Sequence, residues 1–160
     1  MTDLREPAHR VDPRAKAMWA VECAVSALVL VTGAVIVAAL LTEHAARCWV
    51  VALIAAGAVA YVLAVPRWRY LVHRWEITGT AVYTQRGWWA RERRIAPMSR
   101  VQTVDYAQGP LARLFGLATL TVTTASAAGA LRIDGLDRAT ALTLVDQLTL
   151  RAEEAGGDAT

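Results

Sequence analysis

Two long apolar runs constrain the fold of this chain more than any other feature. They extend from Cys23 to Leu41 and from Cys48 to Val65, and their only ionisable side chains are cysteine and tyrosine. Each run is about 18 residues long, or roughly 28 Å as a helix, which approaches the roughly 30 Å hydrocarbon core of a bilayer. The rest of a 160-residue chain is too small to wrap two helices that are apolar all round. We therefore expect two transmembrane helices, at 19–41 and 48–65.

A secretory signal peptide is the competing interpretation of the first run. Its apolar part is too long for a signal peptide, and a second span follows after the short segment Thr42–Arg47. So short a connection makes the two helices antiparallel neighbours. Cations precede the first apolar run and follow the second, whereas the turn between the two runs contains only Arg47. By the positive-inside rule, both termini are expected in the cytoplasm.

The remaining sequence divides into a leader, one domain and a tail. Residues 1–17 contain two prolines, mixed charge and few large apolar residues, so we expect a flexible leader with no fold. The hairpin then occupies 18–66, a folded domain 67–155 and a short tail 156–160. With both termini inside, the domain is expected to face the cytoplasm.

Short β-type segments separated by turn signals dominate this domain. Strands are predicted at 70–78, 81–86, 88–95, 101–108 and 118–124, with a further strand around Leu131 and Ile133 and one short helical turn at 110–116. In the strand 118–124, Leu120 and Val122 alternate with threonines, which predicts one buried and one exposed face.

A helix is expected to close the chain, because apolar residues recur at helical spacing after Asp137, a suitable N-cap. The fold class is therefore α+β: a small, strongly bent antiparallel sheet, with its open end plugged by this C-terminal helix.

Several local motifs resemble a known family. They are the turn at Arg86-Gly87, the segment Ile95-x-Pro97 followed by Arg100-Val101-Gln102, and the turn Gln108-x-x-Leu111-x-Arg113-Leu114-x-Gly116-Leu117. With two preceding apolar helices and a final helix, they resemble the bacterial pleckstrin-homology-like family of small membrane proteins typified by YdbS. The resemblance implies a pleckstrin-homology-like antiparallel β-barrel or sandwich in the bacterial cell (inner) membrane. The sequence departs from the family pattern at Trp88, Trp89 and Phe115.

The most basic part of the domain is a predicted hairpin with two tryptophans. Its candidate binding residues are Arg86, Trp88, Trp89, Arg91, Arg93 and Arg94. Guanidinium groups bind phosphate through a planar fork, and an anionic leaflet attracts each such charge by about 1 kcal/mol. The alternative is a solvated hairpin whose tryptophans fill the barrel, and runs of charge are more commonly solvated faces. Side-chain alternation leaves both interpretations open.

Structural roles are expected for Gln102, Gln108 and Arg113, which can satisfy backbone groups near the turns. No nucleophile paired with a base, no metal-ligand spacing and no phosphate-cradling glycine motif is recognisable, so neither an enzyme nor a metal or cofactor site is expected. A basic helix for nucleic acid is also missing from the sequence pattern.

The sequence therefore predicts a non-catalytic, membrane-anchored interaction module that presents its domain to a partner protein or to another such domain. The alternative is recognition of anionic lipid headgroups by the Arg- and Trp-rich hairpin.

Overall fold

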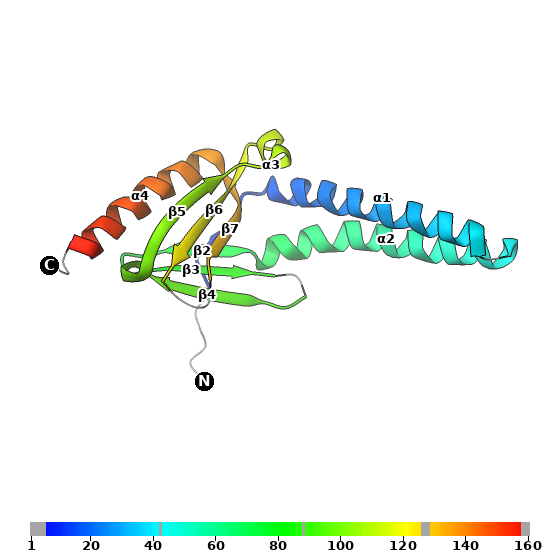
Figure 1. Ribbon diagram of the computed structural model, residues 1–160, viewed down its shortest axis with the longest axis horizontal. Coiled ribbons are helices and arrows are strands. Elements are labelled where there is room, and N and C mark those ends of the chain that lie inside the picture. Colours follow the sequence, from blue (N-terminus) through cyan, green and yellow to red (C-terminus); the bar gives the residue numbers. More distant parts are fainter. Residues whose placement is uncertain (1–5, 42, 88, 126–128, 158–160) are drawn as a thin grey trace. The chain divides into compact units, whose positions relative to one another are not determined.

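The computed structural model describes residues 6–41, 43–87, 89–125 and 129–157. They form two compact units (Figure 1). The first unit is Lys16–Trp68, and the second joins the segment that ends at Ala15 to the segment that begins at Arg69. The second unit is the folded domain that the sequence predicts, with an N-terminal addition.

The first unit is built from two long helices, α1 (Ala15–Leu41) and α2 (His44–Val72). Both are long and apolar enough to cross a membrane, and most of their large apolar side chains are exposed. Arg47 closes the turn between them by donating from Nε to the carbonyl oxygen of Ala38 at 3.2 Å and from Nη2 to that of Ala39 at 3.1 Å.

Helix α2 is longer than expected, since it continues past Pro66 to Val72. The predicted strand 70–78 is therefore wrong at its first three residues. A proline inside a helix removes one hydrogen-bond donor but keeps a φ angle close to the helical value, and a helix that is already formed can continue through it. The aromatic and β-branched residues after Pro66 extend this helix despite their preference for strands.

The second unit contains two antiparallel sheets. One has four strands in the order β1 (His9–Arg10), β2 (Arg74–Ile77), β3 (Ala81–Arg86) and β4 (Glu92–Pro97). The 3-10 helix η1 (Met98–Arg100) leads to the other sheet, with three strands in the order β5 (Val101–Ala107), β6 (Leu117–Thr124) and β7 (Leu131–Asp137). The short helix α3 (Pro110–Leu114) joins β5 to β6, and α4 (Arg138–Gly157) ends the domain.

The two sheets and α4 enclose one core. The four-stranded sheet contributes Val82 and Ala96, and the other sheet contributes the predicted inward residues Leu120 and Val122, both fully buried. Figure 1 shows α4 lying along the three-stranded sheet, where Leu144 and Leu148 enter the core. The predicted α+β class, the inward face of β6 and the amphipathic closing helix are confirmed.

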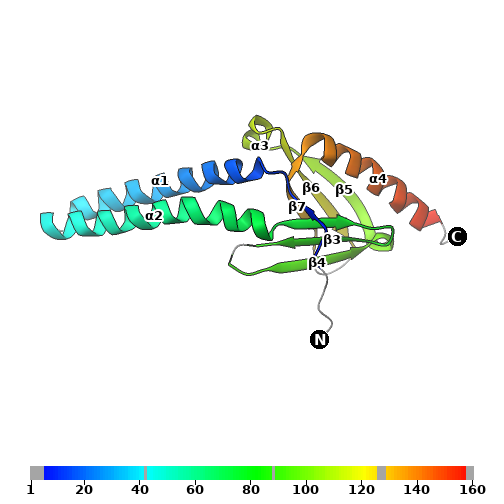
Figure 2. The same cartoon turned by 180° about the vertical axis from the view of Figure 1, so that it is seen from behind.

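The expected flexible leader is wrong for the described residues. His9 and Arg10 form β1, which pairs with Trp75 and Arg74 of β2 (Figure 2, dark blue). The amide of Asp12 donates to the carbonyl oxygen of Gly135 at 2.9 Å, so this segment is also bonded to the other sheet. The low apolar content of this segment predicted no fold. Its order comes instead from main-chain hydrogen bonds to residues that are distant in the sequence.

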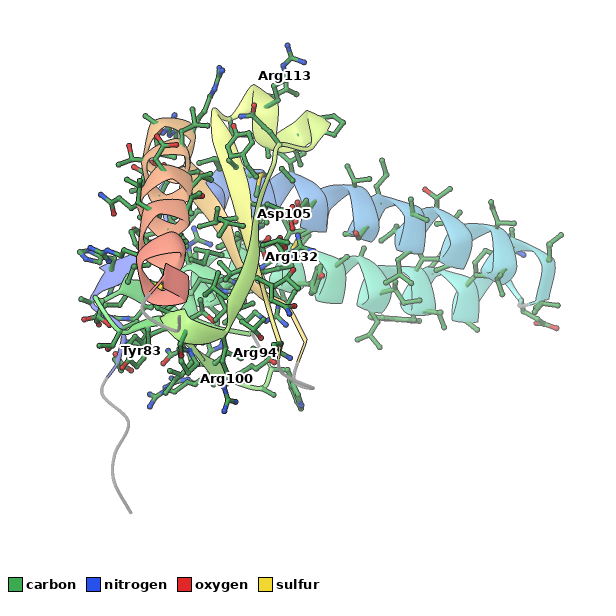
Figure 3. The ribbon with its side chains drawn as sticks, turned by 60° about the vertical axis from the view of Figure 1, so that its left-hand side comes forward. Tyr83, Arg94, Arg100, Asp105, Arg113 and Arg132 are labelled. Carbon is green, nitrogen blue, oxygen red and sulfur yellow. The ribbon has the colours of Figure 1, made fainter. Side chains whose placement is uncertain are left out.

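Two local predictions near turns are confirmed. Asp137 caps α4 by accepting hydrogen bonds from the amides of Ala139 and Thr140 at 2.9 and 3.3 Å. Gln108 satisfies a backbone group, since its Nε2 donates to the carbonyl oxygen of Leu117 at 2.8 Å. Arg113 instead projects outward from α3 (Figure 3).

A candidate interaction surface

Five of the six predicted hairpin residues, Arg86, Trp89, Arg91, Arg93 and Arg94, belong to β3, to β4 or to the described part of the loop between them. This loop is longer than predicted: β4 begins at Glu92, not at residue 88. Gly87 starts the loop with a φ of +124°, and a Cβ there would lie 1.8 Å from the carbonyl oxygen of Ala90. Only glycine fits this close approach, which delays the return strand.

Arg86 and Arg94 lie on the same face of the sheet as the core residues Val82 and Ala96, by alternation along each strand. Both are paired within the hairpin. Glu92 accepts from Nε of Arg86 at 2.8 Å and from Nε of Arg94. These two hydrogen bonds hold the pKa of Glu92 below its usual value.

Arg94 is bonded further to the carbonyl oxygen of Ala130 at 3.0 Å, so it is tied to the other sheet as well. The structure therefore assigns Arg86 and Arg94 a structural role that the sequence pattern did not reveal.

Arg93 and Ile95 point to the opposite, outer face of the four-stranded sheet. Nε of Arg93 donates to Oε1 of Gln85 at 2.8 Å, and Nε2 of Gln85 donates to the carbonyl oxygen of Val72 at 3.1 Å. Gln85 is only 2% exposed, so this chain of bonds fixes the position of Arg93. Ile95 is 47% exposed and presents apolar surface beside it.

The tip of the hairpin exposes Trp89 and Arg91. The indole of Trp89 is 89% exposed, which rules out that it fills the barrel. Trp88 lies outside the described residues. The five described candidates therefore differ: Arg86 and Arg94 are paired with Glu92, whereas Trp89 and Arg91 are exposed at the tip and Arg93 lies on the outer face of the sheet.

The β4 strand ends its sheet, and among the described strands none pairs with its outer edge. The amide of Met98 donates to the carbonyl oxygen of Thr80, so Met98 and Thr80 form a hydrogen-bonded pair. In an antiparallel ladder every second residue forms such a pair, so Ala96, Arg94 and Glu92 direct their backbone groups toward β3. The N–H and C=O of Arg93 and Ile95 then point outward along the edge.

Two cavities flank this edge. One, of about 290 Å³, is lined by Pro7, Glu76, Thr78, Tyr83, Thr84, Arg93, Arg94 and Ile95. The other, of about 260 Å³, shares Arg93, Arg94 and Ile95 and reaches Arg100, Thr124 and Leu131. Figure 3 shows Tyr83, Arg94 and Arg100 in this part of the domain, away from Arg113. The outer edge of β4 thus lies between two cavities that are both lined by arginine side chains.

Three residues near this surface were missed from sequence: Glu6, Arg74 and Gln85. Glu6 lies 3.6 Å from Nη2 of Arg74 and 3.9 Å from Nη2 of Arg93. Glu6 lies in the segment expected to be a flexible leader, and Arg74 is one of the cations that follow the second apolar run. No sequence signal joins them, because the contact depends on strand register.

A buried polar group lies behind the same sheet. His73 is 6% exposed, and its Nδ1 lies 2.8 Å from the carbonyl oxygen of Arg69. Burial, aided by the positive charge of Arg69, lowers the pKa of His73 to about 4. The imidazole is therefore neutral at physiological pH.

The described residues hold no group of three His, Cys, Asp or Glu side chains placed to bind a metal ion. The chemistry available at the surface is that of guanidinium groups, main-chain edge groups and apolar side chains. Such groups recognise acidic and extended ligands.

Comparisons with known proteins agree with this architecture. Residues 23–152 match the family model described as "Bacterial PH domain". The chain is also similar to the UPF0699 transmembrane protein YdbS of Bacillus subtilis (strain 168), with 29% identity over 76% of this chain and 79% of that protein. No solved structure matches it significantly.

Proposed function

The chain belongs to the bacterial PH domain family, and from this membership we propose that it is a non-catalytic interaction module that docks a partner protein on the β3–β4 hairpin and the outer edge of β4. The coarser part of its role follows directly: two membrane-spanning helices anchor a pleckstrin-homology-like domain, which makes the chain a bacterial membrane protein. The finer part concerns what the domain binds and on which side of the membrane it lies.

The observation that carries the proposal is the outer edge of β4. A terminal strand whose main-chain groups point outward can accept a further strand from another protein, and pockets beside it then select side chains. Soluble proteins usually protect such edges. Here the edge keeps Ile95 exposed and lies between two cavities, an arrangement that favours strand addition.

Internal pairing of the arginines supports a protein partner over a strong phosphate site. Arg86 and Arg94 already form ion pairs with Glu92. A lipid phosphate would have to compete with these bonds. A peptide strand would instead use main-chain groups that point away from β3.

The domain is proposed to lie on the cytoplasmic side of the bacterial inner membrane, with both termini there. Arginines precede α1 and follow the apolar part of α2, while the turn contributes Arg47, whose guanidinium is bound to the end of α1. This distribution is the one that the positive-inside rule associates with cytoplasmic ends.

Photo-crosslinking in cells tests the docking surface. A photoreactive amino acid replacing Ile95 in the full-length protein is expected to give a discrete protein adduct. The matched control is Leu142 of α4, which is similarly exposed at 43% but lies outside the surface. Adducts of equal yield at both positions, or adducts with lipid alone at position 95, would refute the proposal.

Anionic lipid is the second candidate ligand, and the exposed pair Trp89 and Arg91 at the hairpin tip is the observation in its favour. Full-length protein in neutral nanodiscs would be incubated with vesicles of phosphatidylcholine or phosphatidylglycerol. Lipid recognition predicts binding that needs phosphatidylglycerol, weakens with salt and is lost in Arg91→Glu. Unchanged binding in that variant would eliminate the hairpin tip as a lipid site.

A further inference from the structure

Three polar residues form a row across the outer face of the four-stranded sheet. Arg74 of β2 is in register with Gln85 of β3, which is in register with Arg93 of β4. Directly opposite residues share a face of an antiparallel sheet, so the two guanidinium groups stand on either side of Gln85. The strands β2 and β4 that carry them lie two strand spacings apart, about 9.6 Å, which leaves room for one acidic group between the two side chains.

Glu6 fills that place in the structure. Its two carboxylate oxygens face Nη2 of Arg74 and Nη2 of Arg93, on strands that are not neighbours. Residues 9 and 10 pair at the other edge of the sheet, beside β2. The segment Glu6–Ala8 must therefore cross the outer face of the sheet to bring Glu6 between the arginines.

The segment makes contacts of three kinds as it crosses. Besides the carboxylate of Glu6, the carbonyl oxygen of Pro7 accepts from Nη1 of Arg74 at 3.4 Å, and the amide of Ala8 donates to Oε2 of Glu76 at 3.0 Å. Pro7 also lines the 290 Å³ cavity, together with Tyr83 and Ile95. The surface thus recognises an acidic side chain, an apolar residue and main-chain groups in one extended peptide.

The two ion pairs of Glu6 are loose. The carboxylate of Glu6 lies 3.6 and 3.9 Å from the two guanidinium nitrogens, which is beyond hydrogen-bond distance, and its side chain is 47% exposed. Ion pairs of this exposure contribute little to stability. The internal segment is therefore an occupant that a better-fitting peptide can displace.

We propose that the row Arg74–Gln85–Arg93 and the adjoining cavity bind an extended acidic segment of the partner protein, with Glu6–Ala8 as the internal occupant that this segment displaces. The proposal rests on the proposed function and specifies the partner's chemistry. A peptide strand paired with the outer edge of β4 would place alternate side chains on the outer face, directly beside Arg93. Main-chain pairing and charge recognition can then act together.

A peptide-binding measurement tests the inference on the full-length protein in neutral nanodiscs. The probe is a fluorescent, N-acetylated peptide with the sequence of residues 1–8. Glu6→Lys places a cation between the two arginines and so expels the internal segment. This variant is expected to bind the probe at least about tenfold more tightly than the wild type, where the tethered segment competes at high effective concentration.

Two further variants make the test specific. Adding Arg93→Gln to Glu6→Lys should abolish the gain, and a probe with glutamine in place of its glutamate should bind at least about tenfold more weakly. Asp146→Asn, an exposed carboxylate change on α4, should bind as the wild type does. If Glu6→Lys disturbs folding, as judged by its melting temperature, Glu6→Gln replaces it with the same expected direction.

Equal binding of the probe by wild type and both Glu6 variants, or a gain that persists with Arg93→Gln, would overturn the inference. The proposed function has a separate readout in the adduct at position 95. An adduct without peptide binding would leave the docking edge in place and refute the acidic segment. Peptide binding without any protein adduct would support recognition of an acidic segment and refute docking at the β4 edge.

Discussion

At the scale of single residues, the hairpin depends on groups whose roles follow from close contacts. Gly87 permits a backbone approach that a Cβ at this position would block, and Glu92 joins two arginines that would otherwise repel each other. Charge alone suggested that all the arginines of this hairpin were equivalent. Their partners show that they are not.

Replacement of Gly87 by alanine is expected to destabilise the domain by about 1–3 kcal/mol, because the new Cβ would clash with a backbone oxygen and the positive φ is strained for any L side chain. Thermal unfolding followed by tryptophan fluorescence measures the loss. Gly79→Ala is the matched control: it has open space around the added Cβ and should change stability much less.

At the scale of elements, the N-terminal segment is part of the domain. Its strand β1 extends one sheet, its Asp12 amide bonds to the other, and Arg14 forms ion pairs with Asp12 and with the α4 cap Asp137. These pairs hold the pKa values of both carboxyl groups below their usual range. A domain beginning at residue 67 would lack all of these contacts.

Val11 tests this integration, since it is 3% exposed although it lies in a polar stretch of sequence. Val11→Ala should lower the free energy of unfolding by about 1–2 kcal/mol through lost burial. Leu142→Ala, an exposed apolar residue on α4, should change it by less than about 0.5 kcal/mol. Denaturant titration in neutral detergent compares the two, and equal effects would argue against an ordered N-terminal segment.

At the scale of the whole molecule, charged and titratable groups make stability depend on pH. They are also the basis for the proposed orientation in the membrane. The folded domain keeps His73 neutral in its interior, while the carboxylates of Asp12, Glu92 and Asp137 are paired with arginine. Acid acts on both kinds of group in the same direction. In the proposed orientation, the arginines that flank the apolar helices keep both termini in the cytoplasm.

Stability is expected to fall as the pH decreases from 6.5 to about 4. In this window His73 takes up a proton in the unfolded chain but not in the folded one, so acid favours unfolding, by up to about 3 kcal/mol. The paired carboxylates add to the loss below about pH 4.5, as pH falls through their lowered pKa values. Melting temperatures of wild type and His73→Gln provide the comparison, and a variant curve equally steep above pH 4.5 would contradict the assignment to His73.

Orientation can be measured with a membrane-impermeant maleimide on intact cells. In a chain with Cys23 and Cys48 replaced by alanine, Glu43→Cys in the turn should be labelled from outside. Asp146→Cys on α4 should be labelled only after lysis. The opposite pattern would place the domain outside the cytoplasm and refute the proposed orientation.

Local patterns predicted much of the architecture, because their causes are local. Alternation in β6 selects its buried face, Asp137 caps the helix that follows it, and two apolar runs specify membrane-spanning helices. Each depends on the period of a strand or helix, or on bonds across a few residues. Errors fell at boundaries, such as the end of α2, where propensity competes with a helix already formed.

By itself, the sequence determined the two apolar helices, the alternating strands, the capped final helix and the overabundance of arginine. Only the tertiary structure decided which arginines face outward, that β4 ends its sheet, and that Glu6 lies between Arg74 and Arg93. The physical reason is the range of the interactions. Periodicity and capping act within one element, whereas register and cross-strand pairing join residues that are far apart in the chain.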